Sequence, residues 1–105
     1  MATRNQGTQP QNGALRIAAE GNLVASSVDG FRKSAMEALA KPCTSVVLDL
    51  QDAEVVDSLG ITLILGLFKT CQQKKLPFQV EGVSPDLLRV FKLFSLPRLF
   101  TILER

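Results

Sequence analysis

The stretch Ser45–Cys71, SVVLDLQDAEVVDSLGITLILGLFKTC, decides the fold that we expect for this chain. It opens with the apolar run Val46–Leu50, whose length and β-branched residues predict a strand buried on both faces. An acidic connection, Gln51–Glu54, and the pair Val55–Val56 lead to Asp57-Ser58-Leu59-Gly60, where a long apolar helix is predicted to begin. A strand that enters a helix through a short turn places that turn at the edge of a sheet, where functional sites tend to lie.

Composition and charge predict a single globular domain. The chain has 105 residues, of which 46% are hydrophobic and 21% charged, as in ordinary soluble proteins. The formal net charge of +2 is too small to indicate binding to nucleic acid or to an anionic membrane. The amino terminus has no signal-peptide pattern, and Cys43 and Cys71 lack metal-binding spacing, so we expect reduced thiols in a cytoplasmic protein. The apolar run 59–68 has about half of the ~20 residues needed to cross a bilayer, so no membrane insertion is expected.

The residues before the central stretch predict an arm, a hairpin and a helix. Met1–Gly13 is polar and almost without apolar residues, which is typical of a flexible arm. Ala14–Ala19 predicts a strand, and Leu23–Ala25 a short returning strand, so that the two would form an opening hairpin. Apolar residues at helical spacing predict an amphipathic helix from Val28 to Leu39, ended by Pro42 and capped by one of Ser26, Ser27 or Asp29.

The residues after the central helix, which we expect to end near Lys74, complete an α/β domain over residues 14–105. Phe78–Gly82 alternates apolar and polar residues, as a half-exposed strand does. Ser84-Pro85-Asp86 predicts the start of a short helix that stops before Pro97, and Leu99–Leu103 predicts a last strand. This order of elements predicts a mixed sheet whose central strands are parallel and joined by right-handed helical crossovers.

Several kinds of catalytic or binding site are excluded by the residues present. The chain has no histidine, which removes Ser-His-Asp and Cys-His catalysis and histidine-based metal sites. Gly60 and Gly66 do not form a glycine-rich phosphate-binding loop. We expect no cofactor and a protein that is not an enzyme; an enzyme or a metal-dependent receiver-like domain is the alternative from a different class.

A divalent-cation pocket like that of a receiver domain is the remaining alternative of this kind. Four carboxylates crowd one connection: Asp49, Asp52, Glu54 and Asp57. Such a pocket would also need several acids after the first strand, where the sequence offers only Glu20. We therefore expect no metal.

Both the wide apolar surface of the central helix and the serine at its start, Ser58, allow a structural and a functional interpretation. Its apolar residues form two stripes, Ile61, Ile64, Phe68 and Cys71 beside Leu59, Leu63 and Leu67, with Leu65 widening the apolar arc. The surplus over the ~100° stripe of a surface helix is either covered by neighbouring helices or docks a partner. Similarly, Ser58 is either an ordinary helix cap or a functional residue.

From Val46 to Arg98 the chain resembles the STAS domain of anti-sigma factor antagonists. The resemblance rests on the strand VVLDL, the segment DSLGITLILGLF and the later segment VSPDLLRVFKLF. In that family the serine or threonine of a D-[ST]-x-G step at the start of the helix is phosphorylated by a partner kinase. The matching residues here are Asp57, Ser58 and Gly60, so the resemblance implies that Ser58 is the phosphorylation site.

The resemblance also implies partners and a mechanism. The unmodified protein would bind an anti-sigma factor that is also a serine kinase, so that a sigma factor is released and transcription is regulated. Phosphorylation of Ser58 would end the complex, and a protein phosphatase would reset it. The implied partner-binding residues lie on the turn and the first half of the helix: Asp57, Ser58, Leu59, Gly60, Thr62, Leu63 and Gly66. We expect neither a nucleic-acid partner nor direct insertion into a membrane.

One departure from the family pattern supports an alternative. Antagonists often carry G-E-L-D near the phosphorylation site, whereas this chain has Gly21-Asn22-Leu23-Val24. Without that last acid, the domain could instead be a non-switching STAS adaptor, for example a subunit of a membrane transport or signalling assembly.

Overall fold

The computed structural model describes residues 10–11 and 13–105. Its elements are, in chain order, β1 (Pro10–Gln11), β2 (Ala14–Ala18), α1 (Val28–Leu39), β3 (Ser45–Asp49), α2 (Ser58–Gln73), β4 (Phe78–Val83), α3 (Pro85–Leu93), the 3-10 helix η1 (Leu96–Arg98) and β5 (Thr101–Glu104). Most elements lie within one or two residues of the predicted ranges.

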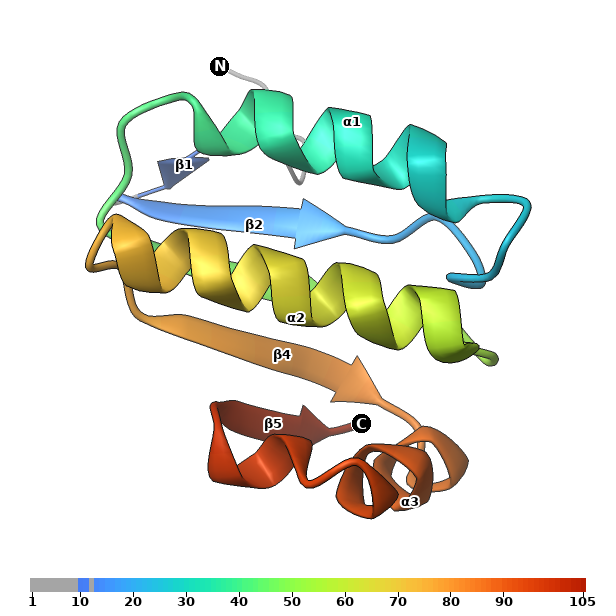
Figure 1. Cartoon of the computed structure of the whole chain (residues 1–105). Helices are drawn as coiled ribbons and strands as arrows, with labels where there is room; N and C mark the ends of the chain where they lie inside the picture. Colours follow the sequence, from blue (N-terminus) through green and yellow to red (C-terminus); the bar gives the residue numbers. More distant parts are fainter. Residues whose placement is uncertain (1–9, 12) are drawn as a thin grey trace.

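The five strands form one sheet in the order β1-β2-β3-β4-β5. β1 is antiparallel to β2, and the other neighbouring strands are parallel. The predicted α/β class, with a mixed sheet and parallel central strands, is therefore confirmed. Figure 1 shows α1 and α2 side by side in front of the sheet, with β2 and β4 on either side of α2.

The helices cover one face of the sheet. Along β3, Val46 and Leu48 are buried, whereas Val47 and Asp49 are only half-buried. The expectation that this strand is buried on both faces was therefore wrong: its apolar run includes residues that face away from the helices. Parallel registry places Leu15, Val46 and Phe78 side by side on the covered face.

A charged network lies on the other face, where Arg16 of β2 contacts Asp49 at 3.1 Å and Glu81 at 3.0 Å. Partial desolvation would lower the pKa of Arg16, but the hydrogen bond to Glu81 and the charges of both carboxylates outweigh it and raise that pKa. These ion pairs connect three neighbouring strands across the face that the helices leave open.

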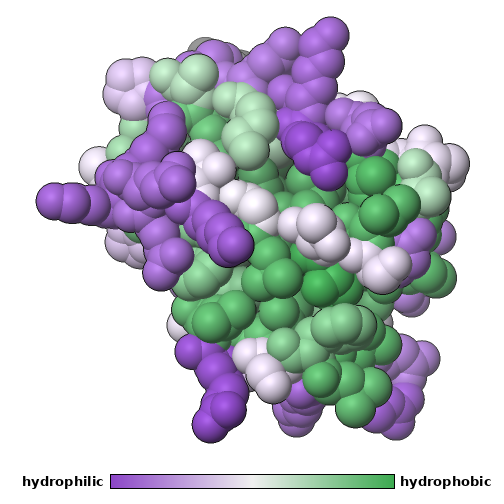
Figure 2. Space-filling view, in the orientation of Figure 1, coloured by the Kyte–Doolittle hydropathy of each residue, from purple (hydrophilic) through white to green (hydrophobic). Residues whose placement is uncertain are grey.

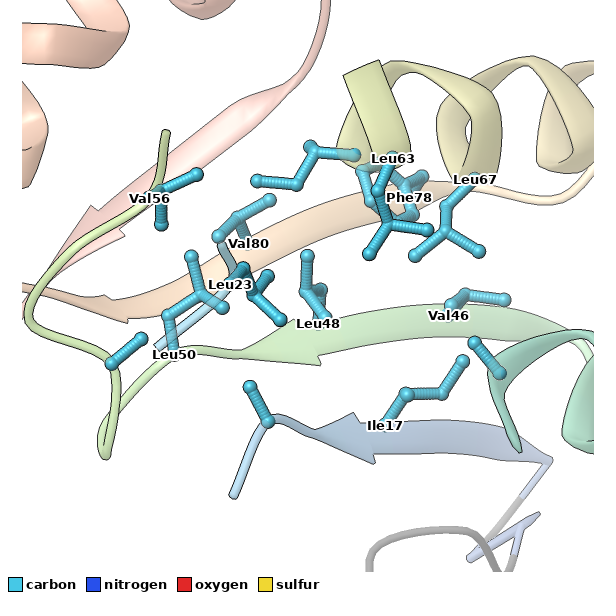
Figure 3. Close-up of a cluster of buried hydrophobic side chains, with 14 of the residues drawn as sticks. Ile17, Leu23, Val46, Leu48, Leu50, Val56, Leu63, Leu67, Phe78 and Val80 are labelled. Carbon is cyan, nitrogen blue, oxygen red and sulfur yellow. The ribbon is translucent and has the colours of Figure 1, made fainter. Parts of the chain in front are cut away.

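The hydrophobic core lies between the sheet and α2. Leu63 and Leu67 point from α2 toward the strands, near Phe78 and Val46 (Figure 3). Phe100, after η1, packs against Phe78 with ring centroids 5.1 Å apart. Leu65 and Phe68 are partly buried against this core, so neighbouring elements cover most of the apolar arc of α2, and Leu59 at its start stays exposed.

The opening of the chain differs from the prediction. Leu23 forms a single parallel bridge with Val56, so Leu23–Ala25 is not a returning strand and no hairpin joins it to β2. The predicted arm lies mainly outside the described residues, at 1–9 and 12, while Pro10–Gln11 pairs with β2. Ser27 occupies the cap position of α1 but makes no capping bond. Its hydroxyl oxygen instead accepts from the backbone nitrogen of Val24 at 3.1 Å, and the hydroxyl donates to the carbonyl oxygen of Asn22 at 2.6 Å.

Candidate functional site

Asp57, and not Ser58, is the N-cap of α2. Its backbone is extended, and its Oδ1 accepts a hydrogen bond from the backbone nitrogen of Gly60 at 2.9 Å. Its Oδ2 accepts a second bond from the backbone nitrogen of Ala25 at 2.9 Å. The carboxylate therefore satisfies one free N–H group of the helix and also holds the segment before α1.

Ser58 is the first residue of α2 and is exposed. Its carbonyl oxygen accepts a hydrogen bond from Thr62 Oγ1 at 3.0 Å. Its hydroxyl makes no hydrogen bond to any residue in 10–11 or 13–105. The interpretation of Ser58 as a cap was therefore wrong, since its neighbour performs that role.

The segment 22–25 lies along the connection between β3 and α2. Asn22 Oδ1 accepts hydrogen bonds from the backbone nitrogens of Glu54 at 2.8 Å and Val55 at 3.0 Å. The backbone of Leu23 continues the pairing, because its nitrogen donates to Val55 and its oxygen accepts from Asp57. The residues that match the family's G-E-L-D step therefore lie against the turn that carries Ser58.

Gly60 permits this close approach. A Cβ atom at position 60 would clash with the carbonyl oxygen of Leu23 and would lie 2.7 Å from Val56 Cγ1. Gly66, two turns later, has nothing within 4 Å of the same hypothetical atom. Only the first of these two glycines is required by packing.

Arg105 holds the other side of the β3–α2 connection. Its guanidinium donates to the carbonyl oxygens of Gln51 at 2.6 Å and Ala53 at 3.0 Å, and it contacts Glu54 Oε2 at 3.0 Å. Its Nε donates to the oxygen of Gly82 at 2.9 Å. A planar guanidinium has enough donors to serve several carbonyl groups at once.

The other predicted site residues divide between the surface and the core. Leu59 is 48% exposed and Thr62 is exposed, while Gly66 is half-buried. Leu63 is only 2% exposed and packs in the core, so we remove it from the predicted partner-binding set. Gly60 is also buried, against Leu23, and its role is to shape the turn.

The four carboxylates of the connection do not converge. Asp49 pairs with Arg16, Asp57 binds backbone nitrogens, and Glu54 pairs with Arg105. Within the described part of the chain, no group of three or more acids and cysteines is arranged to hold a metal ion. The geometry therefore gives a receiver-like metal site no support.

The two cysteines are free thiols. Burial raises the pKa of the Cys71 thiol from 9.0 to about 11, and the nearby Cys43 is a second, smaller cause of this increase. Cys71 is therefore a core residue that stays protonated at neutral pH, as the sequence predicted for a structural thiol.

Sequence reasoning missed Asn22 and Arg105. Asn22 lies between the two strands of the predicted hairpin, in the segment Glu20–Asn22 whose residues are typical of a turn. An asparagine side chain can also bind backbone N–H groups, which is the signal that could have indicated its role. For Arg105 no local signal exists, because its partners lie 23 to 55 residues away in the chain.

The fold and the position of Ser58 define a class of small α/β domain, with helices on one face of a sequentially ordered sheet and a serine opening the central helix. The family model for the STAS domain matches residues 6–105, so the chain belongs to the STAS domain family.

Relatives and solved structures agree with this assignment. The chain is 29% identical over 93 residues to the anti-sigma F factor antagonist of Paenibacillus polymyxa, covering 88% of this chain and 80% of the relative. Its fold is similar to that of a candidate anti-sigma factor antagonist from Thermotoga maritima, with a TM-score of 0.77, 22% identity, and coverage of 88% and 78% of the two chains. It is also similar to a sulfate transporter family protein from Wolinella succinogenes, with a TM-score of 0.71, 16% identity, and coverage of 82% and 72%.

No helix in the described residues combines the length and the hydrophobicity that crossing a membrane requires.

Proposed function

We propose that this protein is an anti-sigma factor antagonist that acts by binding rather than by catalysis. In its unmodified state it binds an anti-sigma factor with serine kinase activity and thereby releases a sigma factor. Phosphorylation of Ser58 by that partner ends the complex, and a protein phosphatase restores binding. The 29% identity to a relative named as an anti-sigma F factor antagonist supports this proposal.

The observation that carries the proposal is the division of roles between Asp57 and Ser58. Because the Asp57 carboxylate caps α2, the fold does not depend on the Ser58 hydroxyl. The hydroxyl is exposed at the first turn of the helix, where a kinase can reach it.

Phosphorylation would change the complex more than the fold. A phosphoserine adds a charge of about −1.5 to −2 at neutral pH. The N-terminus of α2 favours a negative charge, so the isolated domain tolerates the phosphate. Against a packed partner surface the same dianion, beside Asp57, has to lose its water, and each 1.4 kcal/mol of that cost weakens binding about tenfold.

The surface that a partner would contact lies on the exposed side of the first turns of α2. Leu59 is half-exposed beside Ser58 and offers an apolar contact. Thr62 and Gly66 follow on the same helix, where the absence of a side chain at Gly66 lets a partner approach the backbone. These residues, together with Asp57 and Ser58, form the proposed partner-binding set.

The test compares partners recovered from cell extract with four baits: wild type, Ser58→Ala, Ser58→Asp and Ser34→Asp. We expect wild type, Ser58→Ala and Ser34→Asp to recover the anti-sigma factor, and Ser58→Asp to lose it. Ser34→Asp is the matched control because it adds the same charge at an exposed serine of α1. Retention of the partner by Ser58→Asp would contradict the proposal.

The alternative, a non-switching STAS adaptor, is favoured by Val24. This residue lies in the segment that is bonded to Asp57, at the place where antagonists often carry an acid. Intact mass separates the two functions, because phosphorylation adds about 80 Da to the chain. Absence of that increment on Ser58 under every growth condition would favour the adaptor.

A further inference from the structure

A corner of the molecule, formed where α3 meets η1, exposes both large apolar side chains and cations. Leu93 is 84% exposed, Phe94 52% and Leu99 47%. Lys92 and Arg98 are exposed among them. We call these five residues the α3–η1 corner. Hydrophobic surface gathers in the lower half of the face in Figure 2, where Figure 1 places α3 and the segment leading to β5, and hydrophilic groups lie at its lower rim.

The segment that contains the corner carries a net positive charge. Residues 85–99 contain the cations Arg89, Lys92 and Arg98 and the single acid Asp86, which gives +2. The whole chain also carries +2, so charges in the rest of the sequence balance. Arg89 pairs with Asp86 in the preceding turn, whereas Lys92 and Arg98 form no ion pair with any described residue. The net charge of the whole chain, which is only +2, does not by itself reveal this local positive charge.

The corner is held in place from beneath. Phe91 and Leu96 are fully buried and anchor α3 and η1 to the core. Between them Ser95 adopts a left-handed backbone conformation with φ of 61°, which reverses the chain. Phe91 and Leu96 lie on either side of Leu93 and Phe94, and Leu96 also precedes Leu99 in the chain. The exposed apolar side chains therefore extend from a backbone that the two buried residues fix in place.

We propose that the α3–η1 corner binds an anionic membrane surface. Leucine and phenylalanine side chains beside lysine and arginine suit the boundary between lipid headgroups and acyl chains, where the apolar groups are buried and the cations meet anionic lipid. Lysine is depleted in the cores of protein interfaces, which argues against a protein partner at Lys92. A side chain that is 84% exposed also protrudes and lines no groove.

The test is sedimentation of the full chain with phosphatidylcholine vesicles, prepared with and without phosphatidylglycerol. We expect the wild type to pellet only with vesicles that contain phosphatidylglycerol. Replacing Lys92 and Arg98 together by alanine should weaken partitioning roughly thirtyfold at low salt, about fivefold for each cation. Leu93→Glu should abolish binding, and since Leu93 makes little contact with the core, this variant should remain folded.

The matched control replaces Lys33 and Lys41 by alanine, which removes two exposed cations from α1 and the loop after it. This control should bind vesicles like the wild type. Equal pelleting of both double variants, or no pelleting of the wild type, would overturn the proposal. A dimer in solution that Leu93→Glu dissociates, without vesicle binding, would assign the corner to self-association instead. Ser58→Asp should leave vesicle binding unchanged, so this result is separable from the proposed partner switch.

Discussion

The carboxylate of Asp57 binds the backbone nitrogen of Ala25, 32 residues earlier in the chain, at 2.9 Å. The same carboxylate caps α2 through Gly60. One side chain thus sets both the start of the central helix and the position of the segment beside it. The geometry around Ser58 depends on this pair of bonds.

We expect Asp57→Ala to lower the free energy of unfolding by about 1–3 kcal/mol, because it removes a helix cap and leaves the Ala25 nitrogen without its acceptor. Urea unfolding followed by circular dichroism measures the change. Ser58→Ala is the control and should stay within about 0.5 kcal/mol of wild type. Equal losses for the two variants would show that Ser58 contributes to the cap.

Gly60→Ala should destabilise the domain strongly, while Gly66→Ala should be neutral or stabilising by up to about 1 kcal/mol. The first places a methyl group against the Leu23 carbonyl and Val56, so the 22–25 segment has to move. The second fills open space on a helix and raises helix propensity. Thermal unfolding of both variants tests this contrast, and a similar melting temperature for the two would contradict the packing at Gly60.

Ser58→Asp should leave the isolated domain as stable as the wild type, or stabilise it by about 0.3–1 kcal/mol at low ionic strength. The new carboxylate lies at the positive end of α2, and the cap at Asp57 is unchanged. Urea unfolding measures the effect. A loss above about 1 kcal/mol would mean that phosphorylation disturbs the fold itself, and the physical account of the switch would fail.

The stability of the wild type relative to Cys71→Ala should be pH-dependent above neutrality. Burial raises the pKa of Cys71 from 9.0 to about 11, so the folded state holds the proton more tightly than the unfolded state. The buried neutral thiol therefore contributes its full stability below pH 9.0, and this contribution is lost as the pH rises through about 11. Urea unfolding of both proteins across this window measures the difference, which should shrink toward high pH. A constant difference would contradict the shift.

Arg105→Ala should accelerate amide hydrogen exchange in the β3–α2 connection, at residues such as Ala53 and Glu54. The substitution removes the donors that hold the carbonyl groups of Gln51 and Ala53. Arg89→Ala is the control, since it breaks only an exposed pair within α3. Unchanged exchange at the connection would show that the 22–25 segment alone fixes it.

Local patterns predicted the elements well, and contacts between distant segments account for the differences. The sequence predicted the helix start at Ser84 because the capping bond, to the Leu87 nitrogen, joins residues only three positions apart. Asp57 and Ser58 could each have capped α2, and the choice depends on the Ala25 nitrogen, which the sequence around the helix does not reveal. Leu23–Ala25 is apolar enough for a strand. The Asn22 side chain, however, accepts a hydrogen bond from the Glu54 nitrogen and so holds this segment against the β3–α2 connection.

The order of strands in the sheet is also the order in which a ribosome would make them. Each strand from β2 onward pairs with the one before it, so the sheet can assemble during synthesis by addition at one edge. Arg105 follows the last strand and binds the connection made 51 to 55 residues earlier. The contacts between Arg105 and the connection that precedes Ser58 can therefore form only after the final strand has been made.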